Sequence, residues 1–326
     1  MSPRNITTEN PSRDVRRFLQ HWGDETFVAE SLVRRFPAVS AATRRQKSRT
    51  IASAISQGIG YLDAAQTTPL LTKPLPLFYA AENLAKGVAI ALTALLTASD
   101  FKSHGISGDD AKRYSVRNLQ CKVGAPRNDT WSHFFRASNV DSIVVSRDVD
   151  GRGVTSTIRT QYDTKLLPSG TKLVLGELLK HLPELADDIS LVGWGHPYVV
   201  HLSSYRIQQT TGPPRNTAVW LTLRHGHNQD VRRMITSAEG TLLKGFAQSA
   251  DQLDIVSYQC GAEDVEVPHM RMDVFGDLYM DFKRTLTVLG EPVIYLAALH
   301  ILSHLCVTTP NSGSDSSTTI RARPSW

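Results

Sequence analysis

The most apolar stretch of the chain, residues 76–98, reads PLFYAAENLAKGVAIALTALLTA. From Leu77 onward it is apolar on nearly every side of a helix, which is typical of a helix at the centre of a bundle. Three polar residues, Glu82, Asn83 and Lys86, interrupt the stretch, and so many polar groups in one window favour a core helix over a membrane span. We therefore predict a central helix over residues 77–98 and no association with a membrane.

Helical patterns also precede this stretch. We expect helices over residues 12–22, 24–36 and 40–62, with the second ending at Pro37. Apolar residues recur along the third helix at spacings of three and four, as on a helix that buries one face. The proline-rich segment 67–76 predicts a rigid connection to the central helix.

After Gly105 the pattern changes to short apolar runs separated by turn residues, which is typical of strands. Asp150 and Gly151 are a hairpin signal between two such runs. We expect strands over residues 119–123, 130–135, 141–146, 154–162, 198–207 and 218–224. The other expected elements are a helix over 172–181 capped by Thr171, one or two helices over 229–250, a loop or strand over 251–270, and a last apolar helix over 292–307.

The order of these elements predicts an α+β protein, with an N-terminal helical bundle, a β-rich middle region and a C-terminal helix that packs back on the bundle. The tail is polar and of low complexity, which is typical of disorder. The predicted divisions are a disordered leader (1–11), a helical region (12–118), a β-rich mixed region (119–270), a C-terminal helical segment (271–309) and a disordered polar tail (310–326).

The composition is that of an ordinary globular protein, with 326 residues of which 41% are hydrophobic and 21% charged. These values exclude collagen-like, coiled-coil and mostly disordered proteins. The net charge of +5 comes from residues 1–50, which hold ten basic and five acidic residues.

A basic segment on a neutral body suits a partner that carries phosphates, such as RNA or DNA. The alternative interpretation is that these charges are the solvated faces of amphipathic helices. The residues that we expect to contact nucleic acid are Arg34, Arg35, Arg44, Arg45, Lys47 and Arg49.

The three cysteines, Cys121, Cys260 and Cys306, lie far apart and form no Cys-x-x-Cys pair. This pattern argues against a disulfide framework or a zinc knuckle and suits a reducing compartment. The N-terminus also lacks the apolar core of a signal peptide. We therefore expect a cytoplasmic protein.

Four stretches, taken together and in this order, resemble the YaaC-like protein family. Residues 73–86 (KPLPLFYAAENLAK) resemble a family helix in which Lys-Pro-Leu leads into an aromatic pair, and residues 104–106 (HGI) resemble the His-Gly-Leu that follows it. Residues 175–185 (LGELLKHLPEL) resemble a short helix that ends in Ile-Pro-Glu-Leu, and residues 295–303 (YLAALHILS) are similar to the family's C-terminal helix.

This resemblance covers roughly residues 45–306 and implies a HEPN-like helical part. Since HEPN-like modules often pair, it also implies a homodimer. The chain departs from the family after the last helix, where an Arg-Tyr-x-Pro-x-x-Trp segment is usual and only Pro310 is similar.

HEPN-type ribonucleases combine an Arg that stabilises charge on the phosphate with a His, a few positions later, that moves the proton of the 2′-hydroxyl. Arg127 and His133 fit this spacing, although the predicted strand over 130–135 would place them outside a helix. Arg16 and His21 also fit it, on a predicted helix. With 11 histidines in the chain, chance matches are expected.

Glu82 and Lys86 lie one helical turn apart on the central helix. If they are buried, they must pair with each other or with a partner across the bundle. A structural ion pair is one interpretation. The other is a ligand pocket, whose predicted lining is Tyr79, Glu82, Asn83, Lys86 and His104.

Two patterns would allow a metal ion but favour simpler roles. His300 and His304 share one face of the last helix and could bind zinc, but no Glu or Cys completes a site. Asp273, Asp277 and Asp281 would stack on one helical face, which we interpret as solvated rather than as a magnesium site. We expect no metal ion and no cofactor.

The sequence holds no phosphate loop, nucleophile elbow or Gly-x-Gly-x-x-Gly fingerprint, which argues against an ATPase, an α/β-hydrolase or a Rossmann enzyme. The favoured function is that of a non-catalytic, nucleic-acid-associated interaction or regulatory protein. The alternatives are a metal-independent ribonuclease and a structural subunit that binds a protein partner.

Overall fold

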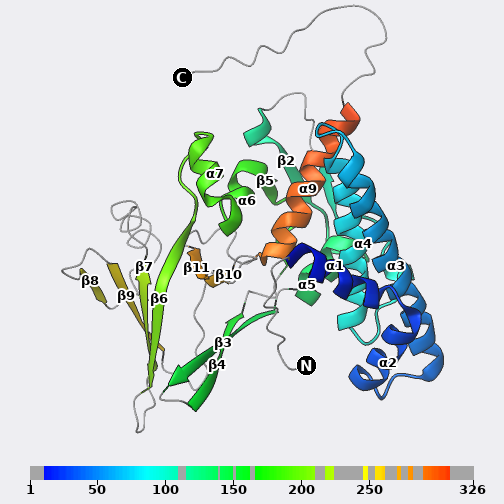
Figure 1. Ribbon diagram of the computed structural model, residues 1–326. Helices are drawn as coiled ribbons and strands as arrows, with labels where there is room; N and C mark the ends of the chain where they lie inside the picture. The colour runs from blue at the N-terminus through cyan, green and yellow to red at the C-terminus, as the bar shows by residue number, and fades with distance from the viewer. Residues whose placement is uncertain are drawn as a thin grey trace, which may run out of the picture.

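The computed structural model describes residues 11–108, 115–138, 140–149, 152–161, 166–209, 217–223, 245–248, 254–260, 270–272, 278–281 and 289–308. These residues form an α+β protein in which helices predominate (Figure 1). The C-terminal helix packs against the N-terminal helical part. The predicted fold class is therefore confirmed.

The centre of the helical part is α4 (Pro74–Leu92). Proline is favourable in the first turn of a helix, where its missing N–H would have no partner. The helices α3 (Ala41–Thr67), α5 (Thr130–Ser138) and α9 (Glu291–Thr308) all pack against α4. The prediction of a central helix is confirmed, but the helix ends at Leu92 and not at Ala98.

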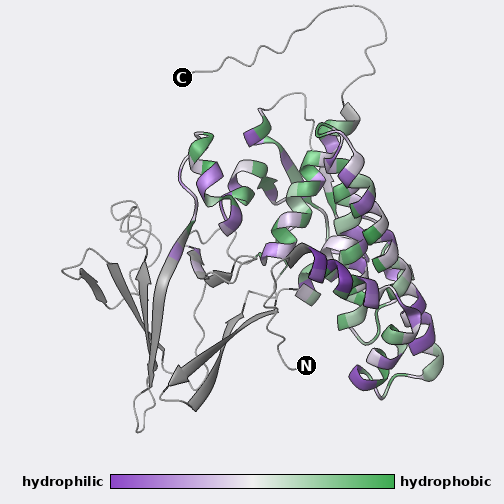
Figure 2. Ribbon diagram, viewed as in Figure 1, coloured by the Kyte–Doolittle hydropathy of each residue, from purple (hydrophilic) through white to green (hydrophobic). Residues whose placement is uncertain are grey.

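Two shorter helices, α1 (Pro11–Trp22) and α2 (Glu25–Arg35), pack on α3. The carboxylate of Asp24 caps α2, because it accepts a 2.7 Å hydrogen bond from the backbone N–H of Thr26. Ser40 caps α3 in the same way. Figure 2 shows that α1 is largely hydrophilic whereas α9 is largely hydrophobic, as their outer and inner positions require.

Two groups of buried side chains hold the helical part together. The first lies between α2, α3 and α4 and includes Val28, Leu32, Ile51, Ile55 and Ile90. The second joins α4, α5 and α9 to a small sheet and includes Phe78, Trp131, Phe135, Leu173, Ile294 and Ile301.

The small sheet is antiparallel, with strand order β1-β2-β5. Its strands are β1 (Ile106–Gly108), β2 (Gln120–Val123) and β5 (Lys172–Val174), and β5 runs directly into α6 (Leu175–Leu179). The strands β1 and β2 and the helix α6 contact α9, so this sheet closes the side of the core that α4 does not cover.

A hairpin and a larger antiparallel sheet make up the β-rich region. The hairpin pairs β3 (Val140–Val149) with β4 (Arg152–Gln161), as predicted from the turn signal between them. The sheet has the strand order β10-β11-β6-β7-β9-β8. Its strands are β6 (Val199–Gln209), β7 (Thr217–Leu223), β8 (Gly245–Gln248), β9 (Asp254–Cys260), β10 (Met270–Met272) and β11 (Leu278–Asp281), and α7 (Ala186–Leu191) precedes β6.

One predicted strand, over residues 130–135, is wrong, because this segment forms α5. The carboxylate of Asp129 accepts hydrogen bonds from the backbone N–H of Ser132 at 2.6 Å and from its hydroxyl at 2.9 Å, and so begins the helix. Trp131, Phe134 and Phe135 then lie buried, at the spacing of a helical face and not of a strand.

Three further predictions in the middle region need correction. The segment 172–181 begins as β5, because Leu173 pairs with Cys121 of β2, and only then becomes helical. Residues 245–248, predicted to be helical, form β8. Asp281 lies on β11 and is buried, so it does not belong to the predicted solvated helical face.

Several predicted features lie outside the described residues, namely most of the leader, the turn residues Asp150 and Gly151, Asp273, Asp277 and the tail from 310. Within the described part of the chain, no helix is long and apolar enough to cross a membrane.

Candidate functional site

The best-defined polar cluster of the helical part centres on the carboxylate of Glu82, which α4 holds at 3% exposure. Three donors converge on its Oε1 atom. His104 Nδ1 lies 2.7 Å away, Lys86 Nζ 3.0 Å and Thr130 Oγ1 3.3 Å. A buried carboxylate is tolerated when it is paired and hydrogen-bonded in this manner, so we name Glu82, Lys86, His104 and Thr130 the Glu82 cluster.

The backbone around Gly105 positions His104. Gly105 has a φ of 80°, which side chains with a Cβ rarely adopt. The carbonyl of His104 accepts a 3.0 Å hydrogen bond from the N–H of Trp131, and the carbonyl of Gly105 accepts one of 2.8 Å from Gly124. The start of α5 and the small sheet thereby hold His104 against α4.

The charges in the Glu82 cluster support one another. Burial raises the pKa of Glu82, but the hydrogen bond from His104 and the charge of Lys86 outweigh it and hold that pKa below its usual value. The hydrogen bond to Glu82 raises the pKa of His104, against burial and the repulsion of Lys86. The cluster therefore favours an ionised carboxylate that accepts a hydrogen bond from His104 Nδ1.

Two histidines of α9 face this cluster. The ring centroids of His104 and His300 are 6.0 Å apart, and those of His300 and His304 are 4.8 Å apart. The Nε2 atoms of His300 and His304 lie 3.2 Å from each other. The ring of Phe78 packs edge-on against His104 and His300, at 5.5 and 4.9 Å.

Both α9 histidines favour the neutral form. Burial, aided by the nearby His304 and His104, lowers the pKa of His300 to about 3. Burial also lowers the pKa of His304, with a smaller contribution from His104. Both imidazoles therefore keep a lone pair on one ring nitrogen at neutral pH.

The predicted pocket residues are brought together only in part. Glu82, Lys86 and His104 meet, whereas the amide of Asn83 donates a 2.8 Å hydrogen bond to the carbonyl of Tyr79, within their own helix. The ring of Tyr79 lies 5.4 Å from that of Tyr61 on α3, and both are partly exposed. Tyr79 and Asn83 thus have local partners outside the Glu82 cluster.

The two residues of the predicted ribonuclease site lie at the start of α5. Arg127 is exposed in the preceding loop, and His133 is half-buried in the first turn. The ring of His133 lies 5.3 Å from that of Phe101, and its buried Nε2 atom has no hydrogen-bond partner in the described part of the chain. No described hydrogen bond joins Arg127 to His133. Of the other candidate pair, Arg16 forms a 2.5 Å ion pair with Asp63.

The basic residues predicted to contact nucleic acid differ in their environment. Lys47 is buried, and its ammonium donates hydrogen bonds to the carbonyls at the end of α4 and just beyond. Arg44 donates to the carbonyls of Phe36, Pro37 and Val39. Arg49 forms an exposed 3.1 Å ion pair with Glu25. Arg34, Arg35 and Arg45 are exposed.

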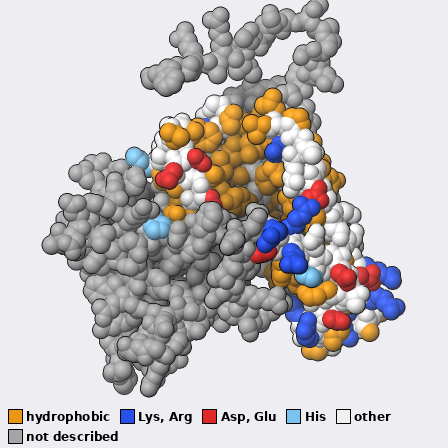
Figure 3. Space-filling model, viewed as in Figure 1, with side chains coloured by type: hydrophobic (Ala, Val, Ile, Leu, Met, Phe, Trp, Pro, Cys, Tyr) orange, Lys and Arg blue, Asp and Glu red, His pale blue; other side chains and the backbone are white. Residues whose placement is uncertain are grey.

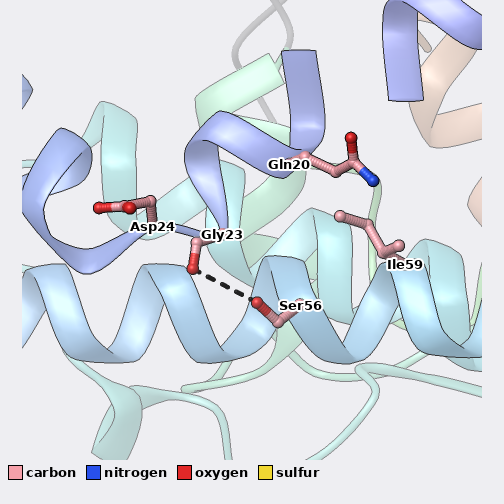
Figure 4. A pocket seen from close by; sticks show the side chains of 5 residues that line it. All are labelled: Gln20, Gly23, Asp24, Ser56 and Ile59. Carbon is pink, nitrogen blue, oxygen red and sulfur yellow. Dashed lines mark hydrogen bonds between the residues drawn. The ribbon is translucent and has the colours of Figure 1, made fainter. Parts of the chain in front are cut away.

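Figure 3 shows Lys and Arg side chains gathered over α1 and α2, with Asp and Glu side chains among them. A shallow hollow of about 340 Å³ lies between the end of α1 and α3 (Figure 4). Its lining is Gln20, Gly23, Asp24, Ser56 and Ile59. The only ionisable group there is Asp24, which already caps α2, so the hollow offers no further chemistry.

Sequence reasoning missed two buried polar features, the His181–Asp281 pair and the side chain of Lys47. His181 Nδ1 lies 2.7 Å from Asp281 Oδ2, and both side chains are fully buried; no local pattern joins residues so far apart. Lys47 could have been found, because it lies four residues before Ile51 and eight before Ile55, on the buried stripe of α3. No local sequence pattern indicated that the histidines of α9 lie opposite His104.

Within the described part of the chain, no group of three or more His, Cys, Asp or Glu side chains is placed so that it could hold a metal ion as it stands. In comparisons with known proteins, the model of the family described as YaaC-like Protein matches residues 16–306 of the chain. No curated protein and no solved structure matches it.

Proposed function

The chain belongs to the YaaC-like protein family, and from this premise we propose that it is a nucleic-acid-associated interaction or regulatory protein that binds RNA or DNA without turnover. The binding surface is the arginine corner, which we define as Arg34 and Arg35 at the end of α2 and Arg45 at the start of α3. We leave Lys47 out of this surface because its ammonium is buried.

The observation that carries the proposal is the placement of these exposed arginines. Arg44 bonds to the carbonyls of residues 36, 37 and 39 and so holds the end of α2 beside the start of α3. None of the three corner arginines has an acidic partner within the described residues, whereas Arg16 and Arg49 do. Arg35 also lies 5.7 Å from the ring of Phe36. Unpaired arginines beside an aromatic ring suit phosphates and stacked bases.

The test is a salt titration of binding, followed by the fluorescence anisotropy of short labelled RNA and DNA oligonucleotides. We expect affinity to fall with salt, and the variant Arg34→Gln/Arg35→Gln/Arg45→Gln to bind more weakly. Its slope of log affinity against log salt should be smaller by about 2, since each phosphate contact on a single strand contributes about 0.7.

A matched control removes three exposed positive charges elsewhere, at Lys102, Lys122 and Lys172. This variant has the same net charge and should keep the wild-type slope. An equal loss in both variants would mean that only net charge matters. Failure of the wild-type protein to bind either nucleic acid would overturn the proposal and favour a structural subunit with a protein partner.

The alternative function is a metal-independent ribonuclease using Arg127 and His133. It gains support from α5, because the segment is helical and puts His133 in the turn that follows Arg127. We expect the wild-type protein to cleave a labelled RNA in the presence of EDTA. Both Arg127→Ala and His133→Ala should lose this cleavage while their circular dichroism spectra stay unchanged. Intact RNA with the wild-type protein would exclude this activity. We also expect a cytoplasmic location. We further expect a homodimer, which sedimentation velocity would test.

A further inference from the structure

We propose that His104, His300 and His304 bind one late first-row divalent metal ion, such as Zn²⁺, through three imidazole nitrogens, with the carboxylate of Glu82 orienting His104 from behind. This site is independent of the arginine corner and of the proposed nucleic-acid binding.

The first observation is the pair on α9. Two nitrogen ligands of a tetrahedral zinc ion, each about 2.0–2.1 Å from it, are about 3.4 Å apart. The Nε2 atoms of His300 and His304 are 3.2 Å apart. Their ring centroids are 4.8 Å apart, close to the roughly 5 Å that two rings on one tetrahedral ion require. The pair is therefore already at ligand separation.

The second observation is the state of His104. Its Nδ1 atom bonds to Glu82 Oε1 at 2.7 Å, which leaves Nε2 to act as a ligand. A metal-bound histidine usually has its other nitrogen held by a carboxylate, which fixes the ring and makes the ligand more basic. Glu82 itself has further partners in Lys86 and Thr130, so the carboxylate that orients His104 is held in position.

The third observation is that neighbouring groups confine the rings of the two α9 histidines. Phe78 packs against both His104 and His300. A Cβ on Gly108 would come within 2.5 Å of the ring of His304, so only glycine leaves room for this imidazole. His300 is 4% exposed, while His104 and His304 reach the surface and leave an entry path for the ion.

Binding requires a rearrangement of His104, because the three imidazoles do not form a metal site as they stand. The His104 and His300 centroids are 6.0 Å apart, which exceeds the roughly 5 Å of two rings on one tetrahedral ion, so the His104 ring must move toward both α9 histidines and leave the fourth position open to water. Imidazole ligands suit Zn²⁺, Co²⁺, Ni²⁺ and Cu²⁺ better than Mg²⁺ or Ca²⁺. The site is therefore expected to discriminate between these two groups of ions.

The test uses the full chain without a polyhistidine tag, freed of metal with a chelator and titrated with ZnCl₂ by calorimetry. We expect one Zn²⁺ per chain and no binding of MgCl₂. Co²⁺ should give the intense visible absorption bands of a tetrahedral site, which report the coordination geometry. The variant His304→Gln should lose most of the affinity, and Glu82→Gln should weaken binding by about 10–100-fold, as for other outer-shell carboxylates.

His21→Gln, at an exposed position on α1, is the matched control and should bind as the wild-type protein does. His104→Ala, at an exposed position, provides a second variant if His304→Gln fails to fold. The proposal is overturned if the wild-type protein takes up no stoichiometric Zn²⁺, or if His304→Gln and His104→Ala, both folded by circular dichroism, bind as tightly as it does.

Discussion

Lys47 is a charged side chain that belongs to the core of the helical part. It is 1% exposed, and its ammonium donates hydrogen bonds to the carbonyls of Ile90, Thr93 and Leu96 at 3.0, 2.7 and 2.9 Å. These carbonyls lie near the end of α4, where no N–H of the helix can reach them. Lys47 therefore ties α3 to the C-terminus of α4.

We expect Lys47→Met to lower the free energy of unfolding by about 2–4 kcal/mol, because three carbonyls lose their donor while the apolar volume is kept. Urea denaturation measures the change. Arg45→Met, two residues away at an exposed position, should change stability by less than about 0.5 kcal/mol. Equal effects of the two substitutions would contradict the capping role.

Lys47 also makes stability depend on pH. Burial lowers its pKa from 10.5 to about 8, against the opposing charge of Asp100. Between these values the unfolded chain keeps a proton that the folded protein has released, so the contribution of Lys47 to the free energy of unfolding rises with pH, by at most about 1.4 kcal/mol per unit. The stability difference between the wild-type protein and Lys47→Met should therefore grow from neutral pH to about pH 10. A difference independent of pH would show that Lys47 does not titrate there.

Gly105 is the residue on which the placement of His104 depends. Its φ is 80°, and a Cβ there would lie 2.0 Å from a carboxylate oxygen of Asp129. We expect Gly105→Ala to cost about 3 kcal/mol or more, from backbone strain and from displacement of the α5 cap. Gly170 has a φ of 84° with no neighbour within 4 Å, so Gly170→Ala isolates the strain, about 1 kcal/mol. Chemical denaturation measures the free energy of unfolding of both variants and so separates the backbone strain from the clash with Asp129. Equal losses of stability in the two variants would exclude a contribution from the clash.

At the scale of the elements, a buried pair joins α6 to the larger sheet. His181 follows α6 and Asp281 ends β11, and their 2.7 Å contact is fully shielded from water. The ring of His181 also lies 5.0 Å from that of Tyr198, just before β6. The pair therefore links the helical part to one end of the sheet.

Removal of either partner should leave the other buried without its main counterpart, at a cost of about 3–5 kcal/mol. We predict that His181→Ala and Asp281→Ala each approach this loss, and that the double variant costs much less than their sum. The exposed pair Arg49–Glu25 is the control and should show a coupling below about 1 kcal/mol. Additive losses at 181 and 281 would show that the two side chains act independently.

At the scale of the whole molecule, α9 completes a core that begins about two hundred residues earlier in the chain. Val293, Ile294 and Ala297 are fully buried against α4 and the small sheet. Loss of α9 would expose this apolar surface to water, and each Å² of buried apolar surface contributes roughly 25 cal/mol to the free energy of unfolding. The stability of the helical part therefore depends on α9.

We expect Ala297→Arg to destabilise the protein by about 4 kcal/mol or more, because a charged side chain would enter the core without a partner. Leu191→Arg, at a site with 85% exposure, should change stability by less than about 0.5 kcal/mol. Differential scanning fluorimetry compares the two variants. A small effect at Ala297 would mean that α9 can leave the bundle without loss of the fold.

Most helices could be predicted because their signals are local. Asp24 and Ser40 are recognisable caps, and the apolar spacing around Ile51 and Ile55 needs no knowledge of the partner helix. The prediction of a strand over residues 130–135 is wrong because aromatic residues favour strands, whereas the Asp129 cap and the core beneath α5 stabilise a helix. In the candidate site, the pairing of Glu82 with Lys86 follows from helical spacing alone.

From the amino-acid sequence alone one can predict the N-terminal helices, the central position of α4 and a last helix that closes the bundle. The spacing of apolar residues shows which face of an element is buried, because it reflects the exposure of that element to water. It does not show which neighbouring element covers that face. Only the tertiary structure decided that His300 and His304 lie opposite His104, that Lys47 caps α4, and that His181 meets Asp281. These contacts join residues that lie at least 43 positions apart, and they arise from packing of the whole core, which no local pattern encodes.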